Sequence, residues 1–422
     1  MKPRRAALWI GVPLGVLALL ASVLLALYFT ARAVLAPLPG EWAIPLRVGP
    51  VRLQAGVPSL IRLATAPWVG PLLHGRTLST SAGPVHMAWL PHSQVLAVRC
   101  APCKLRAPGL GSEPLSFDEV QLTVRRRGGQ LDGELSSGKV RALWHGELLH
   151  GQLRLNLQLP MTPAADGYAL FGAAIPETAR AHIEGRFALQ ATLVLPEGGL
   201  NIVPQVEGLQ VSGLGTEAFA TARSGCSKAA SRLTTSSWLA RAVVAAEDQR
   251  FFEHSGFDLA EFSAALARNQ RDGVQGRIER GGSTLSQQLA KLLVTGDERS
   301  PVRKLRELLY AVEMERTLGK PRILQLYMAH APWGAGICGA EAASRRYFGR
   351  PAHELSPTQA AWLAAMLHNP GLETRRWAET GHINVARTQW VLMAMRPMPR
   401  KQRSRLAEEV EQLAWPAPAA AP

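Results

Sequence analysis

The sequence predicts a chain of several domains: an N-terminal transmembrane helix, a β-rich membrane-proximal domain and a C-terminal domain that is mostly α. Three observations support this class: a long apolar run near the start, period-two alternation through the middle, and a change to helical periodicity near residue 224. The predicted parts are a cytoplasmic tip and anchor (1–35), the β-rich domain (36–220), the mostly α domain (221–410) and a disordered tail (411–422).

The anchor is predicted from the first residues of the chain. Lys2, Arg4 and Arg5 precede an apolar run over residues 6–31, which is long enough to cross a bilayer. Flanking cations favour a cytoplasmic N-terminus, and the apolar core of a cleavable signal peptide is shorter. We therefore expect an uncleaved, single-pass anchor, with the rest of the chain outside the cytoplasm.

The net charge of +15, from 47 basic and 32 acidic residues, indicates an anionic partner such as nucleic acid, anionic lipid or a phosphorylated substrate. No zinc-finger spacing or RNA-binding signature supports nucleic acid. The Cys100–Cys103 pair has no second ligand pair, so zinc is not expected, and a local disulfide and two free thiols both remain open. Cys226 and Cys338 fall in one predicted domain, and whether they pair is open too.

Alternating residues predict strands at Val120–Arg125, Leu153–Leu159 and Phe187–Leu195, which suit an antiparallel sheet or open sandwich. The plainest interpretation of this region is a spacer or interaction module without chemistry. Capping residues predict four helices farther along, beginning after Ser236 or Ser237, at Pro301 after Ser300, at Pro321, and at Pro357 after Ser356. Gly319 is expected just past the end of the second helix.

The stretch "GRIERGGSTLSQQLAKLL" (Gly276–Leu293) predicts a helix that starts with many polar side chains. Thr284 is a suitable N-cap and Gln287 completes a capping box. Thr284, Gln288 and Lys291 follow at i, i+4 and i+7, so a hydroxyl, an amide and a cation share one face near a helix N-terminus, which favours anions. A well-capped surface helix is the alternative.

Two carboxylates are candidates for chemistry. Glu247 lies between an Ala/Val-rich stretch and two phenylalanines, and partial desolvation raises the pKa of a carboxyl toward the range of a general base. Glu307 follows Arg303 by one helical turn, so nearby cations would keep it ionised. Carboxylates in such contrasting surroundings can divide acid/base work from electrostatic work, although a solvated surface charge is the common alternative for any helical Glu.

Five ordered motifs carry a family resemblance: "EDQRFFEHSG" (247–256), "GGSTLSQQLAK" (281–291), "RKLREL" (303–308), "ILQLYMAHAPWG" (323–334), and "GAEAASRRYFGR" followed by "LSPTQAAWLAAMLHNP". Through them, residues from about 224 to 370 resemble the peptidoglycan glycosyltransferase domain, glycosyltransferase family 51, of class A penicillin-binding proteins and monofunctional transglycosylases. The resemblance covers about a third of the chain and implies a lysozyme-like helical fold.

The resemblance implies an activity in cell-wall biogenesis and cell shape: polymerisation of lipid II into β-1,4 glycan, with inversion and release of undecaprenyl pyrophosphate. Glu247 matches the general base that deprotonates the acceptor 4-hydroxyl, and Glu307 matches a second essential glutamate that assists at the pyrophosphate. The matching substrate-binding positions are Ser283, Thr284, Gln288, Lys291, Arg299 and Arg303. Asp248, Arg250 and His254 match positions expected to hold the base and its loop.

The implied partners are lipid II, the growing glycan strand, the membrane, and a separate transpeptidase or envelope protein bound through the β-rich domain; nucleic acid is not expected. Mg²⁺ or Mn²⁺ bound with the substrate pyrophosphate is the one cofactor implied, and no protein metal site is predicted. About 50 residues follow the last motif, too few for a transpeptidase domain. The expected location is the bacterial inner membrane, with the catalytic domain in the periplasm.

Three positions depart from the family pattern. Ala329 stands where Asn is usual, Leu292 replaces Asn after Lys291, and Cys338 stands where an aromatic residue is common. These changes keep open a second hypothesis, a catalytically weak or inactive envelope scaffold that binds lipid-linked sugar or partner proteins. A muramidase-type hydrolase is disfavoured, because a hydrolase needs no pyrophosphate site.

Overall fold

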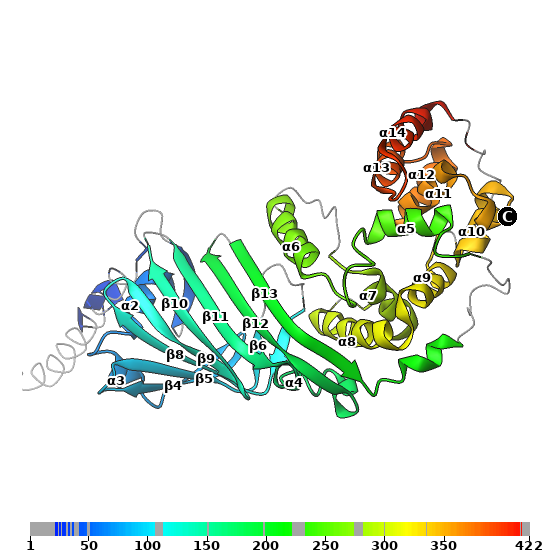
Figure 1. The fold of residues 1–422 in the computed structure, drawn as a ribbon. Coiled ribbons are helices and arrows are strands. Elements are labelled where there is room, and N and C mark those ends of the chain that lie inside the picture. The colour runs from blue at the N-terminus through cyan, green and yellow to red at the C-terminus, as the bar shows by residue number, and fades with distance from the viewer. Residues whose placement is uncertain are drawn as a thin grey trace, which may run out of the picture. The chain divides into compact units, whose positions relative to one another are not determined.

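The computed structural model describes residues 42–48, 51–105, 113–149, 152–196, 199–221, 233–273, 282–298, 300–334, 336–413 and Trp415, with isolated positions between 22 and 37. The chain divides into two compact units (Figure 1): unit 1 holds residues 1–108, 116–160 and 189–203, and unit 2 holds 109–115, 161–188 and 204–422. The β-rich N-terminal region and helical C-terminal region are therefore as predicted. Unit 2 also takes in 161–188 and 204–220, which precede the change of periodicity used to predict the domain boundary.

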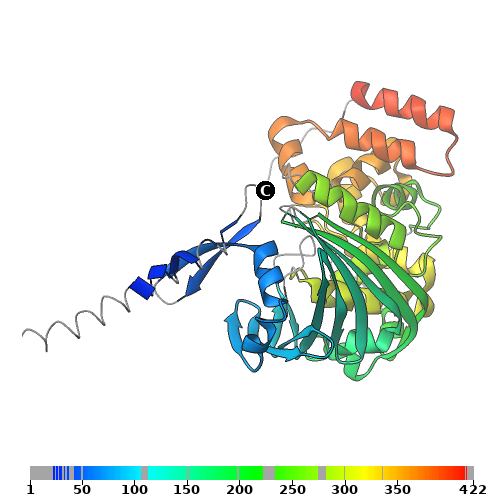
Figure 2. The same cartoon turned by 90° about the vertical axis from the view of Figure 1, so that its left-hand side faces the viewer.

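Nine strands form one sheet in the order β13-β12-β11-β10-β9-β8-β5-β4-β3 (Figure 2). Each neighbouring pair from β11 to β3 in this order is antiparallel. The strands are β3 (Thr77–Thr80), β4 (Gly83–Leu90), β5 (Val95–Cys100), β8 (Val120–Arg127), β9 (Gln130–Ser137), β10 (Val140–Leu148), β11 (Leu153–Pro163), β12 (His182–Leu195) and β13 (Gly199–Ser212). The three predicted strands lie within β8, β11 and β12 and are confirmed. Smaller elements are β1 (Ala43–Val48), β2 (Val51–Gly56), β6 (Cys103–Leu105), β7 (Leu115–Phe117), α2 (Val57–Ala64) and α3 (Gly70–Leu73).

One face of the sheet is apolar because side chains alternate along each strand. In β10, Trp144 and Leu148 are buried and pack with Leu131 and Leu153 from the neighbouring strands. Trp144 lies opposite Gly133 and donates its Nε1–H to the Thr123 carbonyl at 3.1 Å. A Cβ at Gly133 would lie 1.8 Å from that carbonyl oxygen, so only glycine fits beside the indole.

The cysteine pair of unit 1 is oxidised. Cys100 ends β5 and Cys103 begins β6, their Cα atoms are 5.2 Å apart, and a disulfide joins them. Of the two alternatives left open by the sequence, the local disulfide is therefore confirmed. Cys226 lies outside the described residues, so the question of its pairing with Cys338 stays open.

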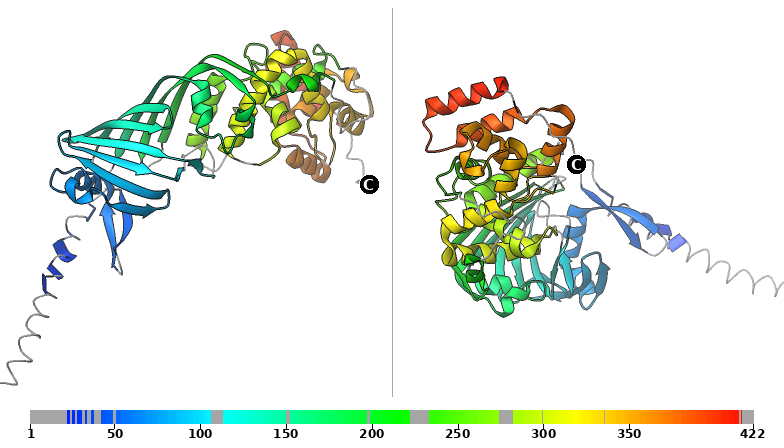
Figure 3. Two further views of the ribbon diagram at one scale, coloured as in Figure 1. Left: turned by 90° about the horizontal axis from the view of Figure 1, so that it is seen from below. Right: turned by 90° about the vertical axis from the view of Figure 1, so that its right-hand side faces the viewer.

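Most of the helices of unit 2 contribute residues to one large apolar core. The helices of unit 2 are drawn in two further views in Figure 3. They are α4 (Ala164–Ala169), η1 (Pro176–Ala179), η2 (Thr216–Ala220), α5 (Trp238–Glu247), α6 (Leu259–Gly273), α7 (Leu285–Ala290), η3 (Lys291–Thr295), α8 (Pro301–Thr317), α9 (Gly319–His330), α10 (Ala340–Phe348), η4 (Ala352–Glu354), α11 (Pro357–Met366), α12 (Pro370–Thr380), α13 (Val385–Ala394), α14 (Arg400–Glu409) and η5 (Val410–Gln412). Nearly every residue of α11 is buried, which makes it the central helix of this core.

The predicted helix starts are mostly confirmed. Ser237, Ser300 and Ser356 each accept a hydrogen bond from the third helical residue, as N-caps do. The prediction that a helix starts at Pro321 is wrong by two residues, because α9 already begins at Gly319. Gly319 has φ +71°, so one left-handed residue ends α8 and opens the next helix.

The predicted anchor falls mostly outside the described residues. Within the described part of the chain, no helix combines the length and apolar character needed to cross a membrane. Of the predicted disordered tail (411–422), residues 411–413 and Trp415 are described. The first two belong to η5 (Val410–Gln412), and Trp415 packs against the core of unit 2. The other tail residues lie outside the described residues.

Candidate active site

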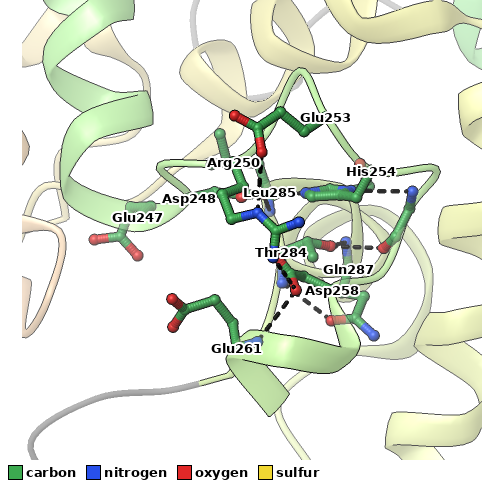
Figure 4. Close-up of polar contacts among 12 residues, drawn as sticks. Glu247, Asp248, Arg250, Glu253, His254, Asp258, Glu261, Thr284, Leu285 and Gln287 are labelled. Carbon is green, nitrogen blue, oxygen red and sulfur yellow. Dashed lines mark hydrogen bonds and ion pairs between the residues drawn. The ribbon is translucent and has the colours of Figure 1, made fainter. Parts of the chain in front are cut away.

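Glu247 is the last residue of α5, and its carboxylate is oriented by side chains from two other helices. Gln288 of α7 donates from Nε2 to Glu247 Oε2 at 3.0 Å. Arg387 of α13 places Nη2 3.9 Å from Oε1. The Glu247 side chain is 13% exposed, so the carboxylate is largely desolvated but still reachable. Figure 4 shows it apart from the hydrogen-bonded cluster around Asp248.

The amide of Gln288 is itself held in one orientation. Tyr327 of α9 donates its hydroxyl to Gln288 Oε1 at 2.9 Å, so the NH₂ group of Gln288 faces Glu247. Burial, followed by the charge of Glu247, keeps the pKa of Tyr327 well above its usual value. Tyr327 therefore stays protonated at neutral pH and continues to donate. The result is a chain of two hydrogen bonds in which Tyr327 donates to Gln288 and Gln288 donates to Glu247.

Asp248 and His254 fasten the loop that follows Glu247 to the start of α7 (Figure 4). The buried Asp248 carboxylate accepts from His254 Nε2 at 3.0 Å and from the Leu285 backbone N–H at 2.9 Å. His254 Nδ1 accepts from the Gly256 N–H at 3.2 Å, so the ring proton is assigned to Nε2. A carboxylate at a helix N-terminus is stabilised by the helix dipole. The two residues thus hold the loop after α5 against the first turn of α7.

Arg250 serves the same loop from its outer side. Its guanidinium donates to Glu253 at 3.0 Å and to Asp258 at 3.1 Å. Asp258 also accepts from the N–H groups of Ala260 and Glu261, which caps the start of α6 (Figure 4). The structure therefore places all three residues predicted to support the base along its loop, and their effect on catalysis stays a prediction.

Thr284 differs from the expectation. The predicted capping box with Gln287 is present, but the Thr284 hydroxyl is buried and donates to the Gly256 carbonyl at 2.7 Å. Its hydrogen bonds are made within the protein, so it belongs to the frame of the site rather than to a ligand-facing surface. Gln288 turns toward Glu247 instead. Thr284, Gln288 and Lys291 therefore do not form the shared ligand-facing surface predicted from helical spacing, because the Thr284 hydroxyl is used in a hydrogen bond to Gly256.

Glu307 lies in α8 and is fully buried between two cations of its own helix. Arg303 pairs with one carboxylate oxygen, and Lys304 pairs with the other at 2.6 Å. Lys304 also donates to the Ser283 hydroxyl at 2.7 Å, so one ammonium group joins the second and third motifs. The predicted substrate-binding residues Ser283 and Arg303 therefore lie in one polar cluster with Glu307.

Lys291 extends the basic surface on the segment after α7. Its Nζ lies 2.6 Å from Asp297, and its side chain is 38% exposed. The hydrogen bond from Lys291 lowers the pKa of Asp297, and the charge of Arg303 adds to this effect. Arg299, the remaining predicted substrate-binding residue, lies outside the described residues.

Three residues of the site were not predicted as such: Lys304, Tyr327 and Arg387. Lys304 was within reach of sequence reasoning, because it precedes Glu307 by three residues in a helix and must share a face with it. Tyr327 lies in the fourth motif, yet nothing local indicates that its hydroxyl reaches Gln288. Arg387 lies 140 positions after Glu247, and no short-range pattern joins them.

The described residues do not form a metal centre of their own. Among the described residues, no three His, Cys, Asp or Glu side chains gather closely enough to hold a metal ion. Both oxygens of Glu307 already face cationic groups, which would repel a divalent ion at that carboxylate. We therefore derive no catalytic step through a protein-held metal.

Comparison with known proteins identifies the helical region. Residues 218–396 match the family described as "Transglycosylase". A biosynthetic peptidoglycan transglycosylase from Citrobacter koseri is 47% identical over 163 residues, which is 39% of this chain and 65% of that protein. One from Thiobacillus denitrificans is 50% identical over 141 residues, 33% of this chain and 57% of that protein. One from Azoarcus is 52% identical over 132 residues, 31% and 56% respectively.

The predicted family is therefore confirmed for this part of the chain. The chain spans about two thirds or less of these relatives' length, and their similarity is confined to about a third of its own residues. Everything before residue 218, including the sheet, lies outside the family match.

Proposed function

We propose that this chain is a membrane-anchored peptidoglycan glycosyltransferase that polymerises lipid II into β-1,4 glycan. The observation that carries the proposal is the pair of contrasting carboxylates. Glu247 is partly exposed, accepts a hydrogen bond from a neutral amide and has one arginine, Arg387, at 3.9 Å. Glu307, by contrast, is buried between two close cations, Arg303 and Lys304. A transferase that deprotonates a sugar hydroxyl and expels a pyrophosphate needs one group of each kind.

Glu247 is the proposed general base. The acceptor 4-hydroxyl loses its proton to Glu247 while its oxygen attacks the anomeric carbon of the donor. The bond between that carbon and the pyrophosphate oxygen breaks, with inversion, and its electron pair leaves with undecaprenyl pyrophosphate. Gln288 keeps the carboxylate in a fixed orientation throughout, which lowers the entropic cost of reaching the transition state.

The cations near Glu307 are the proposed site for the departing pyrophosphate. Lys304 touches both Glu307 and Ser283, and Lys291 is partly exposed on the following segment. Their positive charge would stabilise the negative charge that develops on the leaving group. Glu307 would hold Arg303 and Lys304 in place and prevent their mutual repulsion. Mg²⁺ or Mn²⁺ would enter as a companion of the pyrophosphate, which chelation with EDTA would test.

We further propose an inner-membrane location with the catalytic unit in the periplasm. The apolar run near the N-terminus supports this placement, and so does the Cys100–Cys103 disulfide, since disulfides persist outside the reducing cytoplasm. Lipid II, the glycan strand and the membrane are the proposed partners, together with a separate transpeptidase or envelope protein at the β-rich region.

The decisive experiment is polymerisation of labelled lipid II by the detergent-solubilised full chain beside Glu247→Gln. We expect long glycan from the wild type and a loss of about 10²–10⁴-fold in the variant, the usual contribution of a general base. The replacement has the same size, so folding should be kept. Glu379→Gln, an exposed position on α12, is the matched control and should polymerise normally.

Two results would reject the proposal. A Glu247→Gln variant that polymerises at the wild-type rate would remove Glu247 as the base. A wild-type chain that binds lipid II without forming glycan would favour the scaffold hypothesis and make Ala329→Asn the first reversion to test.

A further inference from the structure

Helix α8 carries a second set of polar side chains that the proposed reaction does not use. Arg306, Tyr310, Glu313 and Thr317 follow at spacings of four, three and four residues, so they share one face, which neighbours the face of Arg303 and Glu307. All four contact Glu177 or the turn at 214–216, which precede the family match at residue 218. These contacting residues belong to the same compact unit as α8.

Glu313 is held by main-chain groups. Its carboxylate accepts from the backbone N–H groups of Leu214 at 2.9 Å, Gly215 at 3.1 Å and Thr216 at 3.3 Å, and the residue is 1% exposed. Gly215 has φ +82°, which lets consecutive N–H groups converge on one anion. Thr317, one turn later, bonds to the Thr216 hydroxyl at 2.8 Å. The turn after β13 is therefore fixed to the middle and end of α8.

Glu177 of η1 makes the second attachment. Arg306 binds it through Nε at 2.9 Å and Nη2 at 2.6 Å. Tyr310 donates its hydroxyl to the same carboxylate at 3.4 Å and accepts from Arg180 at 3.2 Å. Burial opposes ionisation of Glu177, but the hydrogen bonding and charge of Arg306, a backbone hydrogen bond and the Tyr310 hydroxyl together outweigh it and hold the pKa of that carboxyl below its usual value. The pair is therefore charged at neutral pH.

A third attachment lies beside the site itself. Tyr168 of α4 is buried and donates its hydroxyl to the Leu305 carbonyl at 3.2 Å. Leu305 stands between Lys304 and Arg306 in the sequence, within the turn that presents Lys304 to Ser283 and Glu307. The three attachments thus span α8 from the turn with the site cations to its last turn.

We propose that residues 168–180 and 214–216 form a clamp that positions α8, with Glu313 and Glu177 as its positioning residues. The clamp keeps Arg303, Lys304 and Glu307 aligned while negative charge develops on the leaving group. Small displacements of these groups cost large factors in rate. Through the clamp, the β-rich region therefore forms part of the catalytic unit and is not only a spacer. The expected effect on the rate of polymerisation rests on the proposed function, whereas the expected effect on the stability of α8 does not.

The test uses the full chain with Glu313→Gln and Glu177→Gln. Each change keeps side-chain volume and removes the charge that the clamp requires. We expect kcat for lipid II polymerisation to fall about tenfold in each, with KM within twofold of the wild type, since misaligned groups weaken the transition state more than binding. Glu217→Gln, an exposed position in η2 without a role in the clamp, is the control and should keep both constants.

Hydrogen exchange of the α8 amides provides the readout that does not depend on turnover. The clamp predicts faster exchange in α8 for both variants, with unchanged exchange in α11. If Glu313→Gln fails to fold, Tyr168→Phe removes a single hydroxyl and should still lower kcat about twofold to threefold. Wild-type kcat and wild-type α8 exchange in both Glu variants would overturn the clamp, as would a change confined to KM.

The two possible failures are distinguishable. If the wild-type chain forms no glycan, the proposed function fails, and α8 exchange alone then decides on the clamp. If the wild type polymerises and the variants match it, the function stands and the clamp is rejected.

Discussion

Glu247 and Glu307 are both carboxylates on helices of one unit, but the structure treats them in different ways. Glu247 ends its helix, is 13% exposed and receives a hydrogen bond from a neutral amide. Glu307 lies within a helix, is fully buried and faces two cations. A partly exposed carboxylate with one amide donor and one arginine at 3.9 Å remains accessible to a substrate hydroxyl, whereas one that pairs closely with two cations organises them. In the proposed function, Glu247 takes up the proton and Glu307 holds the cations that face the leaving group.

The two residues are also supported from different distances. Glu247 depends on Gln288 and, behind it, Tyr327, which belong to the motifs of the family. The helix of Glu307 is held by a stretch outside the family match, through Glu177 and the turn at Leu214. Glu247 is therefore supported by residues of the family motifs, whereas the helix of Glu307 has an additional support outside the family match.

The strongest test of this contrast is Glu307→Gln. Neutralising the buried carboxylate leaves Arg303 and Lys304 next to each other without a counter-charge, so both should shift and the leaving group should lose support. We expect kcat to fall about 10²–10³-fold, comparable to the loss of one group that stabilises developing charge. The melting temperature should fall as well, because an uncompensated buried charge is costly.

Steady-state polymerisation and thermal melting measure both effects. If Glu307→Gln kept full activity, Glu307 would have no part in the site and the comparison with Glu247 would lose its meaning. Glu298→Gln, an exposed position before α8, is the control for the change of charge alone.

A smaller effect is expected when Glu247 loses its orienting partner. Gln288→Ala removes the donor to Oε2 but leaves the base itself, so kcat should fall about tenfold rather than by the full general-base factor. Tyr327→Phe leaves the amide in place and should cost about twofold to fivefold by freeing its orientation.

The matched control for the amide is Gln249→Ala, an exposed glutamine two residues after Glu247. Initial rates at saturating lipid II compare the variants. Equal losses in Tyr327→Phe and Glu247→Gln would show that Tyr327 contacts the substrate, which would contradict the orienting role.

Sequence reasoning was most successful where the physics is local. The capping box of Thr284 with Gln287 and the N-caps Ser237 and Ser300 each join residues three positions apart. The nature and spacing of such residues nearly determine their contacts. The arrangement of Arg303 beside Glu307 follows from helical spacing in the same way.

The parts that could not be predicted depend on how distant segments pack. Arg387 beside Glu247 and Glu177 beside Arg306 join residues more than 100 positions apart, with no pattern in either segment that indicates the other. Thr284 is a residue for which a contact with a distant segment made the prediction wrong. Its exposure could not be judged before Gly256 was known to lie against it, so a structural cap was predicted to face a ligand.

The smallest expected effect concerns pH and the support of α8. The folded-state pKa of Glu177 is lowered, so the ion pair with Arg306 stabilises the fold above the usual Glu value of about 4.3 and loses that contribution as pH falls through the lower folded value. Glu177→Gln should therefore lower the apparent melting temperature by about 2–6 °C at pH 7, as expected for a charged hydrogen bond in a unit of this size. The difference from the wild type should begin to shrink as the pH falls below about 4.3 and should vanish below the lowered folded-state pKa of Glu177. Melting curves of both proteins from pH 3 to pH 8, beside Glu217→Gln, measure it. A difference that stayed constant down to pH 3 would mean that Glu177 acts through packing alone, and the support of α8 would then be steric rather than ionic.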